Sequence, residues 1–274
     1  MKTLFKVSAA ITLALSISAA SAQQHRVVKL WETPNKLAIP ESVFPDGKIL
    51  YVALINGKPW DKDGVGSIGK VSTEGKIIDT AWVTGLNSPK GMGKHGNILY
   101  VADMDEVVTI DIKKGAVISK IKIDGAENLN DITIDKKGAI YVTDSKLGKV
   151  FKLDGNKGML YLEGLKGLNG IKAVDNDLYV LADAMYRVDP AKKLTKITTL
   201  ENGGDGIEPI GNGDFLVTAW QGYLYYVKAD GTKDILLDTH TANIQTADIG
   251  YDPSTKTIYV PTFFAKSVAA YTLQ

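Results

Sequence analysis

The apolar residues of this chain occur in short runs that recur along its length between polar turns. Six copies of a four-residue motif, most often close to Ile-Leu-Tyr-Val, lie 37 to 49 residues apart. The copies occupy residues 49–52, 98–101, 139–142, 177–180, 214–217 and 257–260. A turn rich in Gly, Asn, Asp or Pro precedes each copy, and short alternating strands follow it. Because no segment has a sustained apolar period of 3.6 residues, the pattern predicts strands rather than helices.

A repeat of this length with four short strands per unit is typical of a propeller blade. The sequence therefore predicts an all-β, six-bladed β-propeller with four antiparallel strands in each blade. Only one strand, residues 267–273, follows the last motif, so blade six lacks a strand. We expect residues 25–31 to supply it, because an N-terminal strand that closes blade six protects the edges of the array. An array that stays open is the alternative.

The first residues have the pattern of an export signal. Lys2 and Lys6 precede an apolar run over residues 7–20, and an Ala-Ser-Ala sequence follows. This order is typical of a signal peptide, and the run is shorter than a membrane span requires. We expect a signal peptide over residues 1–22, one propeller domain over residues 23–274, and a periplasmic or secreted protein with no membrane span after signal removal. An uncleaved anchor is the alternative.

Composition and charge narrow the kinds of site and partner. The chain has no cysteine, which excludes disulfides, thiolate metal sites and a cysteine nucleophile, and its three histidines disfavour a zinc or copper centre. Without Lys2 and Lys6, 30 basic residues balance 31 acidic ones. We therefore expect no nucleic-acid partner.

The first residues of the six innermost strands carry the candidate chemistry. They lie 10 to 12 residues before the third motif position. In chain order they are Glu41, Lys90, Asn130, Asn169, Asp205 and Ala247. Equivalent positions face one axial channel, so two carboxylates and two carboxamides are expected to converge at one end. Calcium prefers such oxygen ligands, so the sequence predicts a Ca²⁺ site, or a site for another divalent cation, formed by Glu41, Asn130, Asn169 and Asp205.

Two other interpretations of these positions stay open. In the first interpretation, Asn169-Gly170 and Asp205-Gly206 only form turns of the backbone, because Asn-Gly and Asp-Gly are common turn dipeptides. In the second interpretation, Lys90 pairs with Glu41 or Asp205, and a dry ion-pair network replaces the metal.

The arrangement resembles the family of gluconolactonase, senescence marker protein-30 and luciferin-regenerating enzyme, and more loosely the paraoxonase and strictosidine synthase-like propellers. The family draws its metal ligands from a Glu of blade one, an Asn of blade four and an Asp of blade five, which match Glu41, Asn169 and Asp205. Asn130-Asp131 is similar to its blade-three Asn-Asp element. The resemblance implies a metal-dependent lactonase with Asp205 as the catalytic base.

Two positions depart from that family. Asn128 stands where well-studied members have an Arg that contacts the sugar acid, and Lys90 is unlike their blade-two residue. The departures bear on the sugar-lactone substrate more than on the metal.

We therefore expect a calcium-dependent hydrolase of a lactone or related ester at the channel mouth. Asp205 or Asp131 would orient or deprotonate water. Substrate contacts are expected from Lys90, Asn128, Asn130, Trp60 and Trp220. The alternative is a non-catalytic binding or scaffold protein of the cell envelope, in which Lys90 pairs with Glu41.

A further acidic residue recurs just after the motif. Asp103, Asp144 and Asp183 occupy this place, and repetition favours a structural capping role. Of the three, Asp144 is expected to come nearest to the channel, because it follows blade three.

Overall fold

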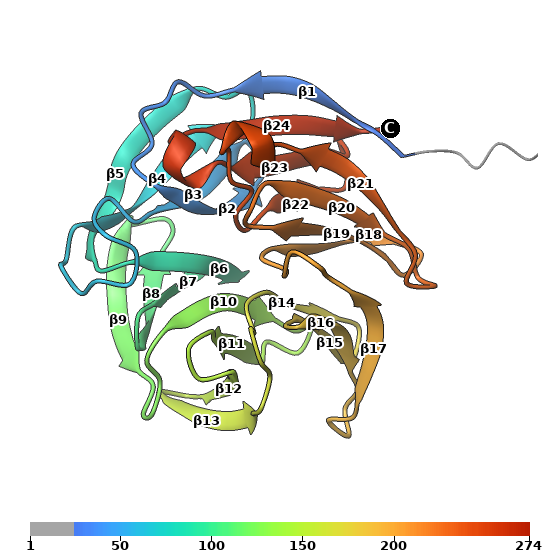
Figure 1. Cartoon of the computed structure of the whole chain (residues 1–274). Coiled ribbons are helices and arrows are strands. Elements are labelled where there is room, and N and C mark those ends of the chain that lie inside the picture. Colours follow the sequence, from blue (N-terminus) through green and yellow to red (C-terminus); the bar gives the residue numbers. More distant parts are fainter. Residues whose placement is uncertain (1–24) are drawn as a thin grey trace, which may run out of the picture.

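The computed structural model describes residues 25–274 of the chain, so the predicted signal peptide over residues 1–22 lies outside the described residues. The described residues form six four-stranded antiparallel sheets arranged around a central axis (Figure 1). The predicted six-bladed, all-β propeller is confirmed. None of the helices within residues 25–274 has the length and apolar character needed to cross a membrane.

The blades follow one another in chain order, and the strands of each blade run from the axis outward. Blade one comprises β2 (Pro40–Asp46), β3 (Ile49–Leu54), β4 (Gly66–Ser72) and β5 (Ile77–Leu86); blade two comprises β6 (Pro89–His95), β7 (Ile98–Asp103), β8 (Glu106–Asp111) and β9 (Ala116–Lys122); blade three comprises β10 (Leu129–Ile134), β11 (Ile140–Asp144), β12 (Lys149–Asp154) and β13 (Lys157–Leu162).

The second half of the ring repeats this plan. Blade four comprises β14 (Ile171–Val174), β15 (Asp177–Leu181), β16 (Ala184–Val188) and β17 (Leu194–Thr199); blade five comprises β18 (Ile207–Gly211), β19 (Asp214–Ala219), β20 (Tyr223–Val227) and β21 (Lys233–Asp238); blade six comprises β22 (Gly250–Asp252), β23 (Thr257–Pro261), β24 (Val268–Leu273) and β1 (Val27–Glu32). Two short 3-10 turns, η1 (His240–Ala242) and η2 (Phe263–Ala265), lie in the connections.

The recurring motif forms the second strand of each blade, which is packed on both faces. Along β3, Leu50 and Val52 belong to the apolar cluster shared with blade six. Tyr51 and Ala53, which alternate with them, belong to the cluster shared with blade two. Successive side chains of a strand point to opposite faces, so a continuous apolar run is what a strand between two neighbouring blades requires.

The N-terminal strand closes the ring, as predicted. β1 pairs antiparallel with β24, with Val27 opposite Leu273 and Glu32 opposite Ala269. Figure 1 shows β1 as the outermost strand of blade six, beside the C-terminus. Trp31 anchors this strand, since its indole nitrogen donates to the Thr73 carbonyl at 3.0 Å and its ring packs against Tyr259 at 5.9 Å.

Truncation of this anchor is expected to destabilise the propeller. Trp31→Ala should lower the free energy of unfolding by about 2–4 kcal/mol, because it removes packing in the cluster between blades six and one. Leu30→Ala is the matched control, since Leu30 lies on the same strand but is 52% exposed. Urea unfolding followed by far-UV circular dichroism measures both changes. Equal effects of the two substitutions would contradict an anchoring role for Trp31.

The acidic residues after the motif act as caps for the backbone between blades. Asp103 accepts hydrogen bonds from the backbone N–H groups of Asn87 at 2.9 Å and Ser88 at 2.7 Å. Asp144 accepts one from the Glu127 N–H at 2.7 Å. The capping role is therefore confirmed for these two residues, whereas the expected approach of Asp144 to the channel is wrong, because backbone donors occupy its carboxylate.

Candidate functional site

Five of the six first positions on the innermost strands meet at one end of the channel. Glu41, Lys90, Asn130, Asn169 and Asp205 line a single pocket of about 310 Å³. The sixth position, Ala247, is buried in a small apolar cluster with Ile55 and Phe263. The structure thus brings together the four residues predicted as metal ligands and Lys90, the lysine of the alternative ion-pair network.

Glycines at the second position allow the innermost strands to approach one another. A Cβ atom on Gly91 would lie 2.6 Å from the Asp131 Cα and 2.7 Å from its Oδ1. A Cβ atom on Gly206 would lie 2.7 Å from Asp248 Oδ1. No side chain is accommodated at such distances, so each glycine leaves space for the carboxylate of the next blade. The signal in the sequence was that this position is small in four blades and acidic in blades three and six.

Asp131 and Asp248 therefore lie below the mouth, in a second and much smaller cavity of the channel. The Ser42 hydroxyl donates to Asp248 at 2.6 Å, and Lys172 pairs with Glu208 at 2.7 Å in the same layer. Asp131 Oδ1 is buried and has no hydrogen-bond partner among the described residues. Of the two predicted catalytic carboxylates, Asp205 lines the mouth pocket and Asp131 lies beneath it.

The channel concentrates negative charge in a buried environment. Burial raises the pKa of Glu41, while Lys90 acts in the opposite direction. Burial and the neighbouring carboxylates raise the pKa of Asp131 and of Asp205 well above the usual value. The same causes, burial first and then the charge of Glu41, raise the pKa of Asp248 to about 7. Such a cluster favours uptake of protons or of a cation.

These shifts predict that, in EDTA, stability falls as pH rises from about 4 to about 7. The folded state holds a proton on Asp248 that the unfolded chain has already released, so the free energy of unfolding decreases with pH in this window. The stabilisation is complete below the unfolded pKa and is lost as pH passes the folded pKa. Its size for this residue is on the order of 2–4 kcal/mol.

Urea unfolding at several pH values in EDTA measures this dependence. Asp248→Asn should flatten the slope, because the amide does not titrate, whereas Asp124→Asn on the exposed surface should leave it unchanged. An identical slope in the native protein and in Asp248→Asn would show that this carboxyl does not hold its proton in the folded state.

Lys90 is buried in the mouth pocket between an acid and an aromatic ring. Its ammonium nitrogen lies 3.6 Å from Glu41 Oε1 and 4.1 Å from the centroid of the Trp60 ring, and its side chain is 2% exposed. The ion pair that the sequence offered as an alternative to a metal is therefore present. The contact with Trp60 is a cation–π interaction, which sequence reasoning did not predict.

The long connection between β3 and β4 places Trp60 in this position. Trp60 adopts a left-handed backbone conformation with φ of 71°, which is costly for a non-glycine residue. Its N–H donates to the Ser88 hydroxyl at 3.2 Å, and Lys62 pairs with Asp105 at 2.6 Å, so blade two holds the connection from outside. The contacts with the neighbouring blade compensate for the strained conformation of Trp60.

The carboxamides of the pocket are oriented by one another. The Asn130 amide nitrogen donates to Asn169 Oδ1 at 2.7 Å and to the Ser145 hydroxyl at 2.9 Å. This orientation leaves Asn130 Oδ1 buried without a partner, and Glu41 Oε2 is in the same state among the described residues. Unpaired buried acceptors are costly, and a hard cation is one group that would satisfy both.

The donor set suits calcium only if the amides take part. Within residues 25–274, no group of three or more His, Cys, Asp and Glu side chains is arranged to hold a metal ion. The predicted set has two carboxylates, Glu41 and Asp205, and completes its oxygens with Asn130 and Asn169. This chemistry matches the neutral and anionic oxygens that calcium accepts.

An aromatic wall covers one side of the polar floor. Trp60, Trp220, Phe263 and Phe264 line the same pocket, and Trp220 packs edge-on against the two phenylalanines at 5.5 and 6.2 Å. Trp220 is 38% exposed and Phe264 is 52% exposed. The expected placement of Trp60 and Trp220 is therefore found. Asn128, by contrast, is not among the residues lining the pocket, and its N–H is directed to Asp144 at 3.3 Å.

Two threonines that sequence reasoning missed hold the ring in register. The Thr143 hydroxyl donates to the Asn169 carbonyl at 2.7 Å and accepts from the Asp131 N–H at 2.9 Å. The Thr218 hydroxyl makes the same bridge in blade five, to the Ala247 carbonyl at 2.9 Å. Each ties the inner strand of its blade to that of the next. The available signal was a threonine directly after the motif in two blades.

Comparison with known proteins supports the fold. No protein-family model and no curated protein sequence matches the chain. An inactive variant of virginiamycin B lyase from Staphylococcus aureus, solved with quinupristin, is similar with a TM-score of 0.64 and 15% identity over 91% of this chain and 99% of that chain. A streptogramin B lyase has a TM-score of 0.67 with 11% identity, over 91% and 98% of the two chains.

A gluconolactonase from Xanthomonas campestris is similar at the same level, with a TM-score of 0.67 and 12% identity over 91% of this chain and 90% of that chain. At these identities the likeness establishes a shared propeller fold. Proteins of two reaction types, a lactonase and lyases, therefore share this architecture.

Proposed function

We propose that the mouth pocket is the active site of a calcium-dependent enzyme that opens a lactone or a related ester. The observation that carries this proposal is the pair of buried oxygens without partners, Glu41 Oε2 and Asn130 Oδ1, which lie in one pocket with Asp205. The aromatic wall above them suits an apolar part of the substrate.

The residues of the pocket have separate roles in this proposal. Glu41, Asn130, Asn169 and Asp205 would hold the calcium ion, which would supply Lewis-acid chemistry at the ester carbonyl. Asp205, whose pKa is raised by burial and by the charges of Glu41 and Asp248, is the residue proposed to accept and return a proton. Lys90 donates to a polar group of the substrate, and its ammonium is held in place by the Trp60 ring.

The bond cleavage follows one of two courses, which the reaction products distinguish. In hydrolysis, Asp205 takes a proton from water, the hydroxide attacks the carbonyl carbon, and the ring opens to a hydroxy acid. In elimination, the base takes a proton from the carbon adjacent to the one that bears the ester oxygen, the C–O bond breaks, and the ring opens to one unsaturated carboxylic acid that is an isomer of the substrate. Mass spectrometry separates them, because hydrolysis adds one water to the substrate.

A lactone and cyclic ester panel, run with EDTA and then with added Ca²⁺, tests the proposal. We expect ring opening that EDTA abolishes and Ca²⁺ restores, and a loss of about 100-fold or more in Glu41→Gln, which removes an anionic ligand. Glu163→Gln, on an exposed connection, is the matched control. Activity that persists in EDTA would contradict the proposed dependence on calcium. Absence of ring opening with every substrate of the panel would contradict the proposed enzymatic function.

The Lys90–Glu41 ion pair favours a second candidate, a binding or scaffold protein without catalysis. In that case the ammonium supplies the positive charge of the pocket, and the aromatic wall contacts a ligand that leaves unchanged. Titration calorimetry with CaCl₂ separates the candidates, since an absence of calcium binding supports this one.

A further inference from the structure

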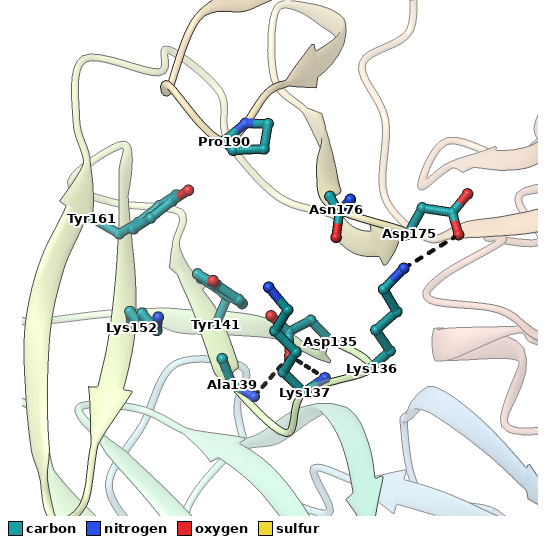
Figure 2. A pocket seen from close by; sticks show the side chains of 10 residues that line it. All are labelled: Asp135, Lys136, Lys137, Ala139, Tyr141, Lys152, Tyr161, Asp175, Asn176 and Pro190. Carbon is teal, nitrogen blue, oxygen red and sulfur yellow. Dashed lines mark hydrogen bonds and ion pairs between the residues drawn. The ribbon is translucent and has the colours of Figure 1, made fainter.

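A pocket outside the channel lies between blades three and four, at the strand ends opposite the channel mouth. It has a volume of about 580 Å³. Figure 2 shows its side chains, which come from the β10–β11, β14–β15 and β16–β17 turns and from the strands β11, β12 and β13. The proposed active site uses none of these residues.

Corresponding turns elsewhere in the ring differ from the turn of blade four beside this pocket. In blades one and five, the turn before the outer strand has glycine at its left-handed position, with φ of 86° at Gly75 and 84° at Gly231. Both turns close tightly on the preceding blade. A Cβ atom would lie 2.7 Å from the Trp31 ring at Gly75, and 2.3 Å from the Ile197 carbonyl oxygen at Gly231.

Blade four has a lysine at the same turn position. The Lys192 N–H donates to the Asp189 carbonyl, and the Asp189 N–H donates to the Lys193 carbonyl, as the equivalent groups do around Gly75. Lys192 has φ of 65°, a conformation that L-residues adopt at a cost. A lysine thus stands where the turns of blades one and five have a glycine, and the repeat departs from its own pattern beside the pocket.

The floor of the pocket is aromatic and offers free hydroxyl groups. Tyr141 and Tyr161 pack edge to face, with centroids 5.0 Å apart. Neither phenol is hydrogen-bonded to another of the described residues, and Asn176 presents its carboxamide nearby in Figure 2. Ring faces with hydroxyl and amide groups at their edges are suited to the hydroxyl-bearing ring of a sugar.

The rim of the pocket is positively charged. The ammonium of Lys152 lies 5.5 Å from the Tyr141 centroid, and that of Lys192 lies 4.5 Å from the Tyr161 centroid. Lys136 is paired with Asp175 at 3.8 Å. The ion pairs of the described residues leave Lys152 and Lys192 without a carboxylate partner.

Lys137 adds a third ammonium to the rim. Its side chain extends from the β10–β11 turn toward Tyr141 in Figure 2. The neighbouring Asp135 carboxylate accepts the backbone N–H groups of Lys137 at 2.8 Å and Ala139 at 2.9 Å, so it serves the turn.

We propose that this pocket binds an acidic sugar, with the lysines around its carboxylate and the two tyrosines against its ring. The charge selects an anion, and the aromatic floor selects a ligand with a ring rather than a bare ion. This inference does not rest on the proposed enzymatic function, because the two pockets lie at opposite ends of the strands and share no residue.

Titration calorimetry with D-glucuronate on residues 23–274 tests the proposal, with D-glucose and inorganic phosphate as comparison ligands. We expect glucuronate to bind at least about tenfold more tightly than either, which is the effect of one charge-assisted hydrogen bond or one ring contact. Lys152→Gln and Lys192→Gly should each weaken binding about tenfold. Lys48 is an exposed lysine in the turn between β2 and β3 of blade one, and Lys48→Gln should leave glucuronate binding unchanged.

Backbone amide NMR shifts on glucuronate addition locate the site, and they are expected at residues 135–139 and 191–193. Lys192→Gly should retain or raise the thermal midpoint, because glycine adopts the left-handed conformation readily. Absence of glucuronate binding, binding unaffected by both lysine variants, or phosphate binding as tight as that of glucuronate would each overturn the proposal.

Discussion

Replacement of Asp205 by Asn is expected to lower kcat/KM for ring opening by at least about 100-fold, the lower range for loss of a general base. Asp205 is the one of the two predicted catalytic carboxylates that lines the mouth pocket. Its raised pKa comes from burial and from the charges of Glu41 and Asp248. An amide keeps the size and the oxygen of the side chain, but it neither accepts a proton nor carries charge.

Steady-state kinetics on the best lactone of the panel, with saturating Ca²⁺, measures this loss. Asp124→Asn, an exposed residue on the connection between β9 and β10, is the matched control. Urea unfolding should show that the Asp205→Asn protein is at least as stable as the native protein at pH 7, because one of several repelling carboxylates is removed. Wild-type turnover in a folded Asp205→Asn protein would exclude Asp205 as the base.

The ring and its polar mouth could be predicted from the sequence because they follow from a repeat. Once Tyr51 and its equivalents are aligned, the number of blades, the closing strand and the residues that begin each inner strand are fixed by spacing. This alignment alone predicts that Glu41, Asn130, Asn169 and Asp205 converge, and the structure places them in one pocket.

The features that the sequence did not predict depend on contacts outside the repeat. Trp60 lies over Lys90 because an irregular connection is held by Ser88 and by the pairing of Lys62 with Asp105. No periodicity specifies such contacts. Asn128 was placed in the pocket by alignment with a family, but its N–H contacts Asp144 instead.

Single residues that depart from the repeat mark contacts present in some blades and absent from others. Thr143 and Thr218 follow the motif in two blades and bridge to the next inner strand. Lys192 stands where the equivalent turns of blades one and five have a glycine, and its ammonium lies over the Tyr161 ring of the pocket between blades three and four. In a ring of similar units, a residue that differs from its equivalents in the other blades points to a local role, because the fold itself does not require it.

Lys90→Met is expected to raise the affinity for Ca²⁺ at least about tenfold. The ammonium lies 3.6 Å from Glu41 Oε1, so it competes with a divalent cation for the same carboxylate. Two charges of like sign at such a distance repel by several kcal/mol at the effective dielectric constant of a protein, which exceeds the roughly 1.4 kcal/mol of a tenfold change. Methionine preserves the packing against Trp60 without the charge.

The same substitution should destabilise the protein when calcium is removed. Without its partner, Glu41 is a buried and unpaired carboxylate, so the free energy of unfolding in EDTA at pH 7 should fall by about 3–5 kcal/mol. Added Ca²⁺ should restore this loss in the variant, because the ion then supplies the missing positive charge.

Titration calorimetry and urea unfolding, each with and without Ca²⁺, measure both effects. Lys94→Met is the matched control, since Lys94 lies on the same strand and pairs with Asp46 outside the mouth pocket. A variant that gains no calcium affinity would show that Lys90 and the ion do not share a site. Absence of calcium binding in both proteins would leave the ammonium as the cation of the pocket, and the binding or scaffold role would then be the function that the ring supports.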